Sequence, residues 1–155
     1  MKKILLSAFV MLFCTISVFA DNKQEAIKFF NNYVNAANTY SENIPDMYSP
    51  KAKIIREVVK PDGTLVDVNT DTATYMKQLR LNRSIAKVRK YTNTYRNITA
   101  VPVAKGYKVS AERQPKGETY WLKTYQVIQK QPDGKWLIVE EMMQTKEQIF
   151  LRYAK

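Results

Sequence analysis

The chain has 155 residues, of which 45% are hydrophobic and 25% are charged, and this is the composition of a globular protein rather than a disordered one. It contains no histidine and a single cysteine, Cys14. The sequence therefore excludes imidazole acid–base chemistry, the Ser-His-Asp triad and zinc sites built on His or Cys. With four glycines and no metal-ligand spacing or phosphate-cradling loop, we expect neither a metal nor a cofactor.

The N-terminus has the features of a signal peptide. A short start with two lysines is followed by an apolar run of about fifteen residues at 4–18, which is shorter than the roughly twenty residues that a membrane-spanning helix needs. We expect cleavage after Ala20 and export of residues 21–155, a single domain without a further membrane span, to the periplasm or the exterior of a bacterial cell. Phe13 occupies the position where a lipobox requires a small residue, which argues against lipidation of Cys14.

Positive charge is concentrated in one part of the expected mature chain. That chain carries 23 Lys and Arg against 14 Asp and Glu, a net charge of +9. Between Asp71 and Glu112 there is no acidic residue, and nine basic residues lie there. The candidate anion-binding residues in this stretch are Arg80, Arg83, Lys87, Arg89, Lys90 and Arg96. A basic surface favours anionic partners, although the same charges can also form a face that is simply solvated.

Two tyrosines, Tyr91 and Tyr95, are interleaved with these basic residues. Arginines beside aromatic rings suit phosphate and polyanion recognition, by bidentate hydrogen bonding and stacking. We therefore expect an anionic lipid head group or an acidic protein as the partner of such a surface. Nucleic acid is not an expected partner because no nucleic-acid motif is present.

The first half of the mature chain predicts two helices. Apolar residues at spacings of three and four predict an amphipathic helix over 22–40, and Pro45 prevents its continuation. A short apolar stretch around Ile54 and a turn lead into a strand at 64–68. Asp71 is placed to cap a second helix.

From residue 88 onward the hydrophobic period changes to two. Four β-type segments follow, at 88–100, 103–114, 118–131 and 135–145. Tight turns between consecutive strands predict an antiparallel meander. The fold class is therefore α+β, with N-terminal helices packed on one face of a curved antiparallel sheet.

The segments Tyr48-Ser49-Pro50-Lys51-Ala52 and Asp133-Gly134-Lys135-Trp136, in this order of elements, resemble the nuclear transport factor 2-like superfamily, particularly its exported, SnoaL-like bacterial members. The resemblance covers about residues 24–145. It implies a cone-shaped domain with a pocket at the open end, a small-molecule ligand and, frequently, a homodimer formed through the sheet. Helix facing and this resemblance together give the expected pocket residues, which are Phe30, Tyr33, Tyr48 and Tyr125.

The resemblance does not imply one activity, because the superfamily contains isomerases, dehydratases, cyclases and binding modules. Most aspartates of this chain occupy turn or cap positions, with Asp67 as the exception. Glu140 and Glu141 are adjacent on the last strand, so their side chains point to opposite faces and cannot act on one substrate; one can face inward or pair with a basic neighbouring strand. No catalytic residue can be assigned. The sequence therefore favours a non-catalytic exported binding protein for a small molecule or an anionic partner, with a SnoaL-like isomerase, dehydratase or cyclase as the alternative.

Overall fold

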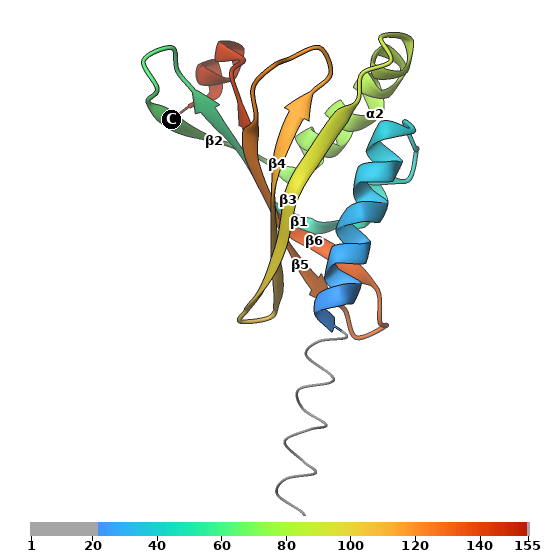
Figure 1. The fold of residues 1–155 in the computed structure, drawn as a ribbon. Helices are drawn as coiled ribbons and strands as arrows, with labels where there is room; N and C mark the ends of the chain where they lie inside the picture. The colour runs from blue at the N-terminus through green and yellow to red at the C-terminus, as the bar shows by residue number, and fades with distance from the viewer. Residues whose placement is uncertain (1–21, 155) are drawn as a thin grey trace, which may run out of the picture.

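The computed structural model describes residues 22–154 (Figure 1). The expected signal peptide, its cleavage site after Ala20 and the lipidation question at Cys14 lie outside the described residues. A helix over residues 22–38 is followed by η1 (Ile44–Met47), β1 (Tyr48–Val59), β2 (Leu65–Thr70), α2 (Thr72–Val88), β3 (Asn93–Val103), β4 (Gly106–Pro115), β5 (Leu122–Lys130), β6 (Trp136–Thr145) and η2 (Gln148–Tyr153).

The strands form one six-stranded sheet in the order β2-β1-β6-β5-β4-β3. The meander expected for the second half of the chain is confirmed, because β3, β4, β5 and β6 pair antiparallel in sequence. The pair of β1 with β6 is parallel, which makes the sheet mixed. The N-terminal helix and α2 contribute to the same core and lie on the same side of the sheet (Figure 1). The fold class is α+β, as predicted.

Strand β1 is the main difference from the sequence prediction, which recognised only a short apolar stretch around Ile54. The structure has a 12-residue strand, Tyr48–Val59. This strand pairs with β2 over Ile54–Val59 on one side and with β6 on the other, so its second half lies inside the sheet. A register shift between Tyr48 and Lys53 interrupts the period-two pattern by which strands are recognised in a sequence.

Both helices have defined ends. Asp71 caps α2 as predicted, because its side chain accepts a hydrogen bond of 3.0 Å from the Thr74 backbone N–H. At the other end of α2, Lys90 has a φ of 50°, and the Tyr91 N–H donates to the Ala86 carbonyl at 2.9 Å. The helix therefore ends with Lys90 in the left-handed conformation, at a position that glycine usually occupies. Because Val88 still belongs to α2, strand β3 begins later than the predicted segment at 88–100.

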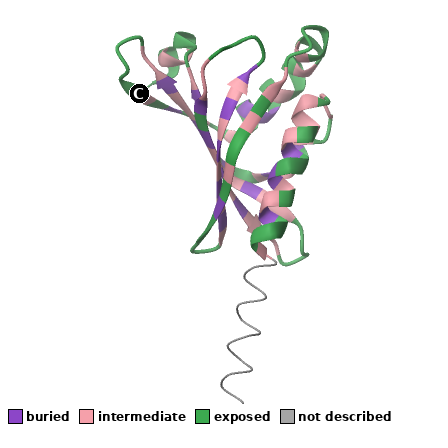
Figure 2. Cartoon of the chain, in the orientation of Figure 1, coloured by how far each residue is buried: buried purple, intermediate pink, exposed green. Residues whose placement is uncertain are grey.

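The core fills the space between the N-terminal helix, α2 and the inner face of the sheet. Phe30, Ile128 and Ile138 are among its fully buried side chains, and the outward sides of the helices are exposed (Figure 2). All buried members of this cluster lie between residues 26 and 138, so the domain from residue 22 onward contains its own core. No helix within residues 22–154 is long and apolar enough to cross a membrane.

Candidate functional site

Glu141 is the centre of a buried hydrogen-bond network on the inner face of the sheet. Its side chain has no exposed surface. Its Oε2 accepts from the Tyr48 hydroxyl at 2.5 Å and from Gln126 Nε2 at 3.0 Å. Its Oε1 accepts from the Tyr75 hydroxyl at 3.1 Å and from Arg56 Nη1 at 3.3 Å. A buried carboxylate is stable only when it is paired and hydrogen-bonded, and four donors meet this requirement here.

A β-bulge in β6 places Glu141 on this inner face. Val127 pairs with Glu140 and Ile128 with Ile138, which leaves one extra residue in β6. Ile138 and Glu141 are therefore both fully buried although they are three residues apart. Glu140 points to the outer face, where it accepts a hydrogen bond of 2.6 Å from the Tyr125 hydroxyl. The two carboxylates thus lie on opposite faces of the sheet, as the alternation predicted.

Three tyrosine rings pack around the carboxylate. The rings of Tyr33 and Tyr48 meet edge to face at 6.2 Å between centroids, and those of Tyr48 and Tyr75 at 5.7 Å. The Arg56 guanidinium carbon lies 4.7 Å from the centroid of the Tyr75 ring. The hydroxyls of Tyr33 and Tyr48 are 3.2 Å apart, so the network reaches from the sheet to the N-terminal helix.

The protonation states of this network follow from burial. Burial, and then the negative charge of Glu141, raise the pKa of Tyr33 and Tyr48 well above the ordinary value of 10.0. Burial raises the pKa of Tyr75 to about 12, against the lowering effect of Arg56. Burial disfavours the charged form of Arg56, but Tyr75 and Glu141 outweigh it and its pKa is raised. At neutral pH the tyrosines are therefore protonated donors, not bases, and Arg56 is a cation.

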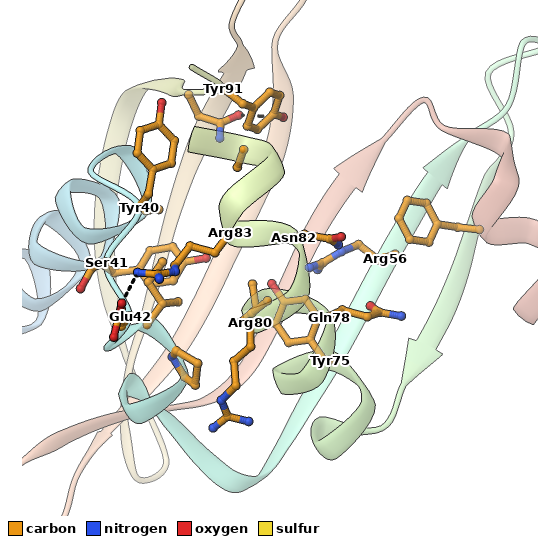
Figure 3. Close-up of a pocket in the computed structure, with 18 residues that line it drawn as sticks. Tyr40, Ser41, Glu42, Arg56, Tyr75, Gln78, Arg80, Asn82, Arg83 and Tyr91 are labelled. Atoms are coloured by element: carbon orange, nitrogen blue, oxygen red, sulfur yellow. Dashed lines mark hydrogen bonds and ion pairs between the residues drawn. The ribbon is translucent and has the colours of Figure 1, made fainter. Parts of the chain in front are cut away.

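A cavity of about 580 Å³ adjoins this network, and the residues that line the cavity are drawn in Figure 3. Its wall is formed by the end of the N-terminal helix, η1, α2 and the sheet. Tyr33, Arg56 and Tyr75 belong both to the network and to the cavity wall, so the network forms the floor. A cavity of this volume is in the range of small-molecule sites.

The charged groups on the cavity wall are three arginines and one glutamate. Arg56 is paired with Glu141 beneath the floor. Arg83 Nη1 lies 2.7 Å from Glu42 Oε1, the ion pair drawn in Figure 3. Among the described residues Arg80 has no ion-pair partner. The wall therefore carries one uncompensated positive charge.

The structure brings together some of the predicted pocket residues. Tyr33 lines the cavity, and Tyr48 lies behind it in the Glu141 network. Phe30 is buried in the core, where its ring meets that of Tyr95 edge to face at 5.6 Å. Tyr125 lies outside the site, contrary to the expectation, because the side chains of its neighbours in β5 face the core and strand alternation turns Tyr125 to the outer face.

The six predicted anion-binding residues do not form one surface, because the structure places them in three separate locations. Arg80 and Arg83 line the cavity. Arg96 projects from the outer face of β3. There its Nε lies 2.7 Å from Glu112 Oε2, and its guanidinium carbon lies 4.0 Å from the centroid of the Trp121 ring. The remaining three are exposed at the C-terminal end of α2: Lys87, Arg89 and Lys90. The aspartate singled out in the sequence, Asp67, is exposed on β2 and does not line the cavity.

Sequence reasoning did not identify Arg56, Tyr75 or Gln126 as site residues. Arg56 lies on the unrecognised strand β1, and Tyr75 and Gln126 have no neighbouring motif. The sequence indicates Glu141 only as one of the adjacent residues Glu140 and Glu141, without a signal for which of the two faces inward. Within residues 22–154, no group of three or more Asp, Glu, His or Cys side chains is arranged to hold a metal ion.

No protein-family model and no curated protein matches the sequence. Solved structures match the fold. An NTF2-like protein with a cystatin-like fold from Novosphingobium aromaticivorans superimposes with a TM-score of 0.62 over 88% of this chain and 89% of its own, at 8% identity. A protein provisionally named a ketosteroid isomerase, from Shewanella frigidimarina, gives a TM-score of 0.55 over 75% of this chain and 91% of its own, at 16% identity.

A third structure is provisionally named a dehydratase of the NTF2-like family, from Streptomyces avermitilis. It gives a TM-score of 0.59 over 81% of this chain and 96% of its own, at 9% identity. The chain therefore has the fold of the NTF2-like proteins, as the sequence resemblance predicted. At these identities the likeness concerns the fold alone.

Proposed function

We propose that this protein is a non-enzymatic binding protein that holds a small molecule with an apolar body and one anionic group in the cavity above Glu141. The observation that carries the proposal is the uncompensated charge of Arg80 on a cavity wall without a free carboxylate. A carboxylate group on the ligand would neutralise Arg80 and accept a charge-assisted hydrogen bond from its guanidinium. Gln78 and Asn82 also line the cavity, but they project from another side of α2 (Figure 3) and would contact a different part of the ligand.

The rest of the cavity wall suits an apolar body. Tyr40, Tyr91 and Phe150 contribute rings, and Leu79 and Ala86 contribute aliphatic surface. Small-molecule sites are commonly lined in this way, with a few polar groups that fix the orientation of the ligand. An aromatic carboxylate combines both features.

The state of Glu141 argues against acid–base catalysis. A general base must reach the proton that it removes, and its oxygens must be free to accept that proton. Glu141 is fully buried, and both of its oxygens already accept two hydrogen bonds each. The carboxylate on the cavity wall, Glu42, is tied to Arg83. With no histidine in the chain, a substrate in this cavity would meet no free base among the lining residues that the structure describes.

An isomerase or dehydratase is the second candidate, and one observation favours it. The floor of the cavity is a chain of protonated tyrosines that ends at Tyr33, which lines the cavity and could exchange its hydrogen bond with the Tyr48 hydroxyl for one to a substrate carbonyl oxygen. Two proteins of the same fold carry the provisional names ketosteroid isomerase and dehydratase. Conversion of a β,γ-unsaturated ketosteroid to its conjugated isomer, abolished by Tyr33→Phe, would support this candidate against simple binding.

The binding proposal is tested with two matched probes, 2-naphthoate and the neutral 2-naphthalenemethanol, by isothermal titration calorimetry. We expect the carboxylate to bind at least about tenfold more tightly than the alcohol, since one charge-assisted hydrogen bond supplies about 1.4 kcal/mol or more. Arg80→Gln should remove this difference. Arg89→Gln, an exposed arginine that does not line the cavity, is the matched control and should leave it unchanged. Equal affinity for both probes, or equal loss in both variants, would reject the proposal.

We also propose that the protein acts outside the cytoplasm, on the basis of the signal-peptide features of its N-terminus. Intact-mass measurement of the protein recovered from the periplasm or the medium should give a chain that begins at Asp21. Retention of Met1, or a lipid on Cys14, would contradict this.

A further inference from the structure

Helix α2 has two sides of different character. On its inner side Tyr75 and Met76 are buried, and Ala86 lines the cavity. On its outer side Leu81, Ile85 and Val88 are exposed by 65%, 52% and 83%. Spacings of four and three residues place these three side chains on one line along the helix. We call this line the α2 stripe.

Exposed apolar side chains occur singly on many proteins, but three aligned on one helix are unusual on a protein surface. Within the described structure nothing covers the α2 stripe. A helix that keeps such a line exposed loses the free energy that burial would supply, which indicates that another surface covers it.

The surroundings of the α2 stripe are uniformly basic. No acidic residue occurs from Thr72 to Ala111, so α2 and the turn after it carry positive charges only. The exposed cations of this helix and turn that do not line the cavity are Lys77, Lys87, Arg89 and Lys90. The helix therefore combines an apolar line with a cationic border, and the surface that covers it must offer apolar groups beneath negative charges.

We propose that α2 docks flat on an anionic lipid membrane, with the α2 stripe among the acyl chains and the bordering cations at the phosphate groups. This combination is typical of helices that lie in the membrane interface. Each basic side chain near an anionic surface adds to the attraction, which falls off within a Debye length. The docking is peripheral, and it is a separate property from ligand binding in the cavity because the α2 stripe lies on the other side of the helix.

Vesicle flotation tests this proposal with the domain from residue 22 onward, which contains its own core, so that the apolar run at 4–18 cannot bring the chain to lipid. The vesicles are POPC alone and POPC with POPG in a ratio of three to one. We expect at least about tenfold stronger partitioning onto the POPG vesicles at about 0.1 M salt, and a large decrease at about 1 M salt.

The variant Leu81→Gln/Ile85→Gln/Val88→Gln removes the apolar line and keeps every charge and good helix formers. It should partition onto POPG vesicles at least about tenfold more weakly than the wild type. The matched control is Val101→Gln/Val103→Gln, which changes two exposed valines of β3 and should partition like the wild type. Circular dichroism verifies that both variants are folded.

Three results would overturn the proposal. The first is the absence of binding to POPG vesicles, and the second is unchanged binding of the triple variant. The third is self-association of the wild type in sedimentation velocity that the triple variant abolishes, which would assign the α2 stripe to a second copy of the chain. If the wild type binds POPG vesicles but does not bind 2-naphthoate, the proposed function is rejected and this inference stands.

Discussion

The hydroxyl of Tyr48 lies 2.5 Å from Oε2 of Glu141, although the two residues are 93 positions apart in the chain. This contact joins the first residue of β1 to the middle of β6 and is completely enclosed. Tyr75, Gln126 and Arg56 also donate to Glu141, so this carboxylate is the centre of the inner face of the sheet. The stability of the fold and the shape of the cavity floor therefore depend on the same network.

The first prediction concerns the buried charge pair. Glu141→Gln should lower the free energy of unfolding by about 3 kcal/mol or more, because Arg56 would keep its charge in a buried position without a counterion. The double variant Glu141→Leu/Arg56→Met should lose less free energy of unfolding than the sum of the losses measured for Glu141→Leu alone and Arg56→Met alone. Urea unfolding measures all of these values. Glu112→Gln, which removes an exposed ion pair with Arg96, should have a much smaller effect. An equal loss in both Gln variants would contradict the central role of Glu141.

The second prediction concerns alkaline pH. The pKa of Tyr75 is raised to about 12 in the folded protein, whereas an unfolded tyrosine titrates near 10. Below pH 10 both states hold the proton, and the contribution to stability is fully present. Between about pH 10 and pH 12 the unfolded chain loses the proton first, so stability falls by about 1.4 kcal/mol per pH unit for this group.

Other groups also titrate in this range, so the comparison is between the wild type and Tyr75→Phe. The variant should be less stable at neutral pH because it lacks the hydrogen bond to Glu141, and its stability should fall less steeply above pH 10. Thermal unfolding at a series of pH values measures both effects. Parallel curves would show that the Tyr75 hydroxyl does not contribute to the alkaline transition.

The third prediction concerns the end of α2. Lys90 adopts a φ of 50°, a left-handed conformation that costs a residue with a Cβ roughly 1 kcal/mol. Lys90→Gly should therefore raise the free energy of unfolding by up to about 1 kcal/mol. Lys87→Gly removes the same charge from the last turn of the helix and should lower stability by a similar amount. Destabilisation by both changes would argue against the left-handed end.

The fourth prediction concerns the cavity itself. Ala86 lines it from α2, so Ala86→Phe should fill part of the volume and weaken 2-naphthoate binding by at least about tenfold. Ser84→Phe introduces the same ring at an exposed position of the helix that does not line the cavity, and binding should persist. Calorimetric titration distinguishes the two. Unchanged binding in Ala86→Phe would place the ligand elsewhere.

The sequence predicted the parts of the fold that have a local signal. Asp71 caps α2 because its side chain can accept a hydrogen bond from a backbone N–H of the first turn. The turn before β6 contains Gly134 at a φ of 84°, which glycine adopts without a steric penalty. Strand β1 has no such signal, since a register shift breaks its alternation and its parallel pairing with β6 depends on residues far along the chain.

The site was less predictable than the fold for a specific reason. Glu140 and Glu141 are chemically identical neighbours, and the sequence shows that only one can face inward. The choice between them depends on the bulge at Val139, which carries no glycine or other marker. Tyr125 lies on the outer side because its neighbours in β5 face the core, and there its hydroxyl donates to Glu140.

The parallel pairing of β1 with β6 also determines when the domain can form during synthesis. The second neighbour of β1 in the sheet is β6, which lies far along the chain from β1 at residues 136–145. Until β6 has left the ribosome, β1 has one open edge, and the partner that Tyr48 and Arg56 need does not yet exist. Contacts so distant in sequence slow folding, because a long loop must close first. A chain without β6 can form hairpins but cannot complete this fold, so the sheet around β1 closes only after Glu141 has been made.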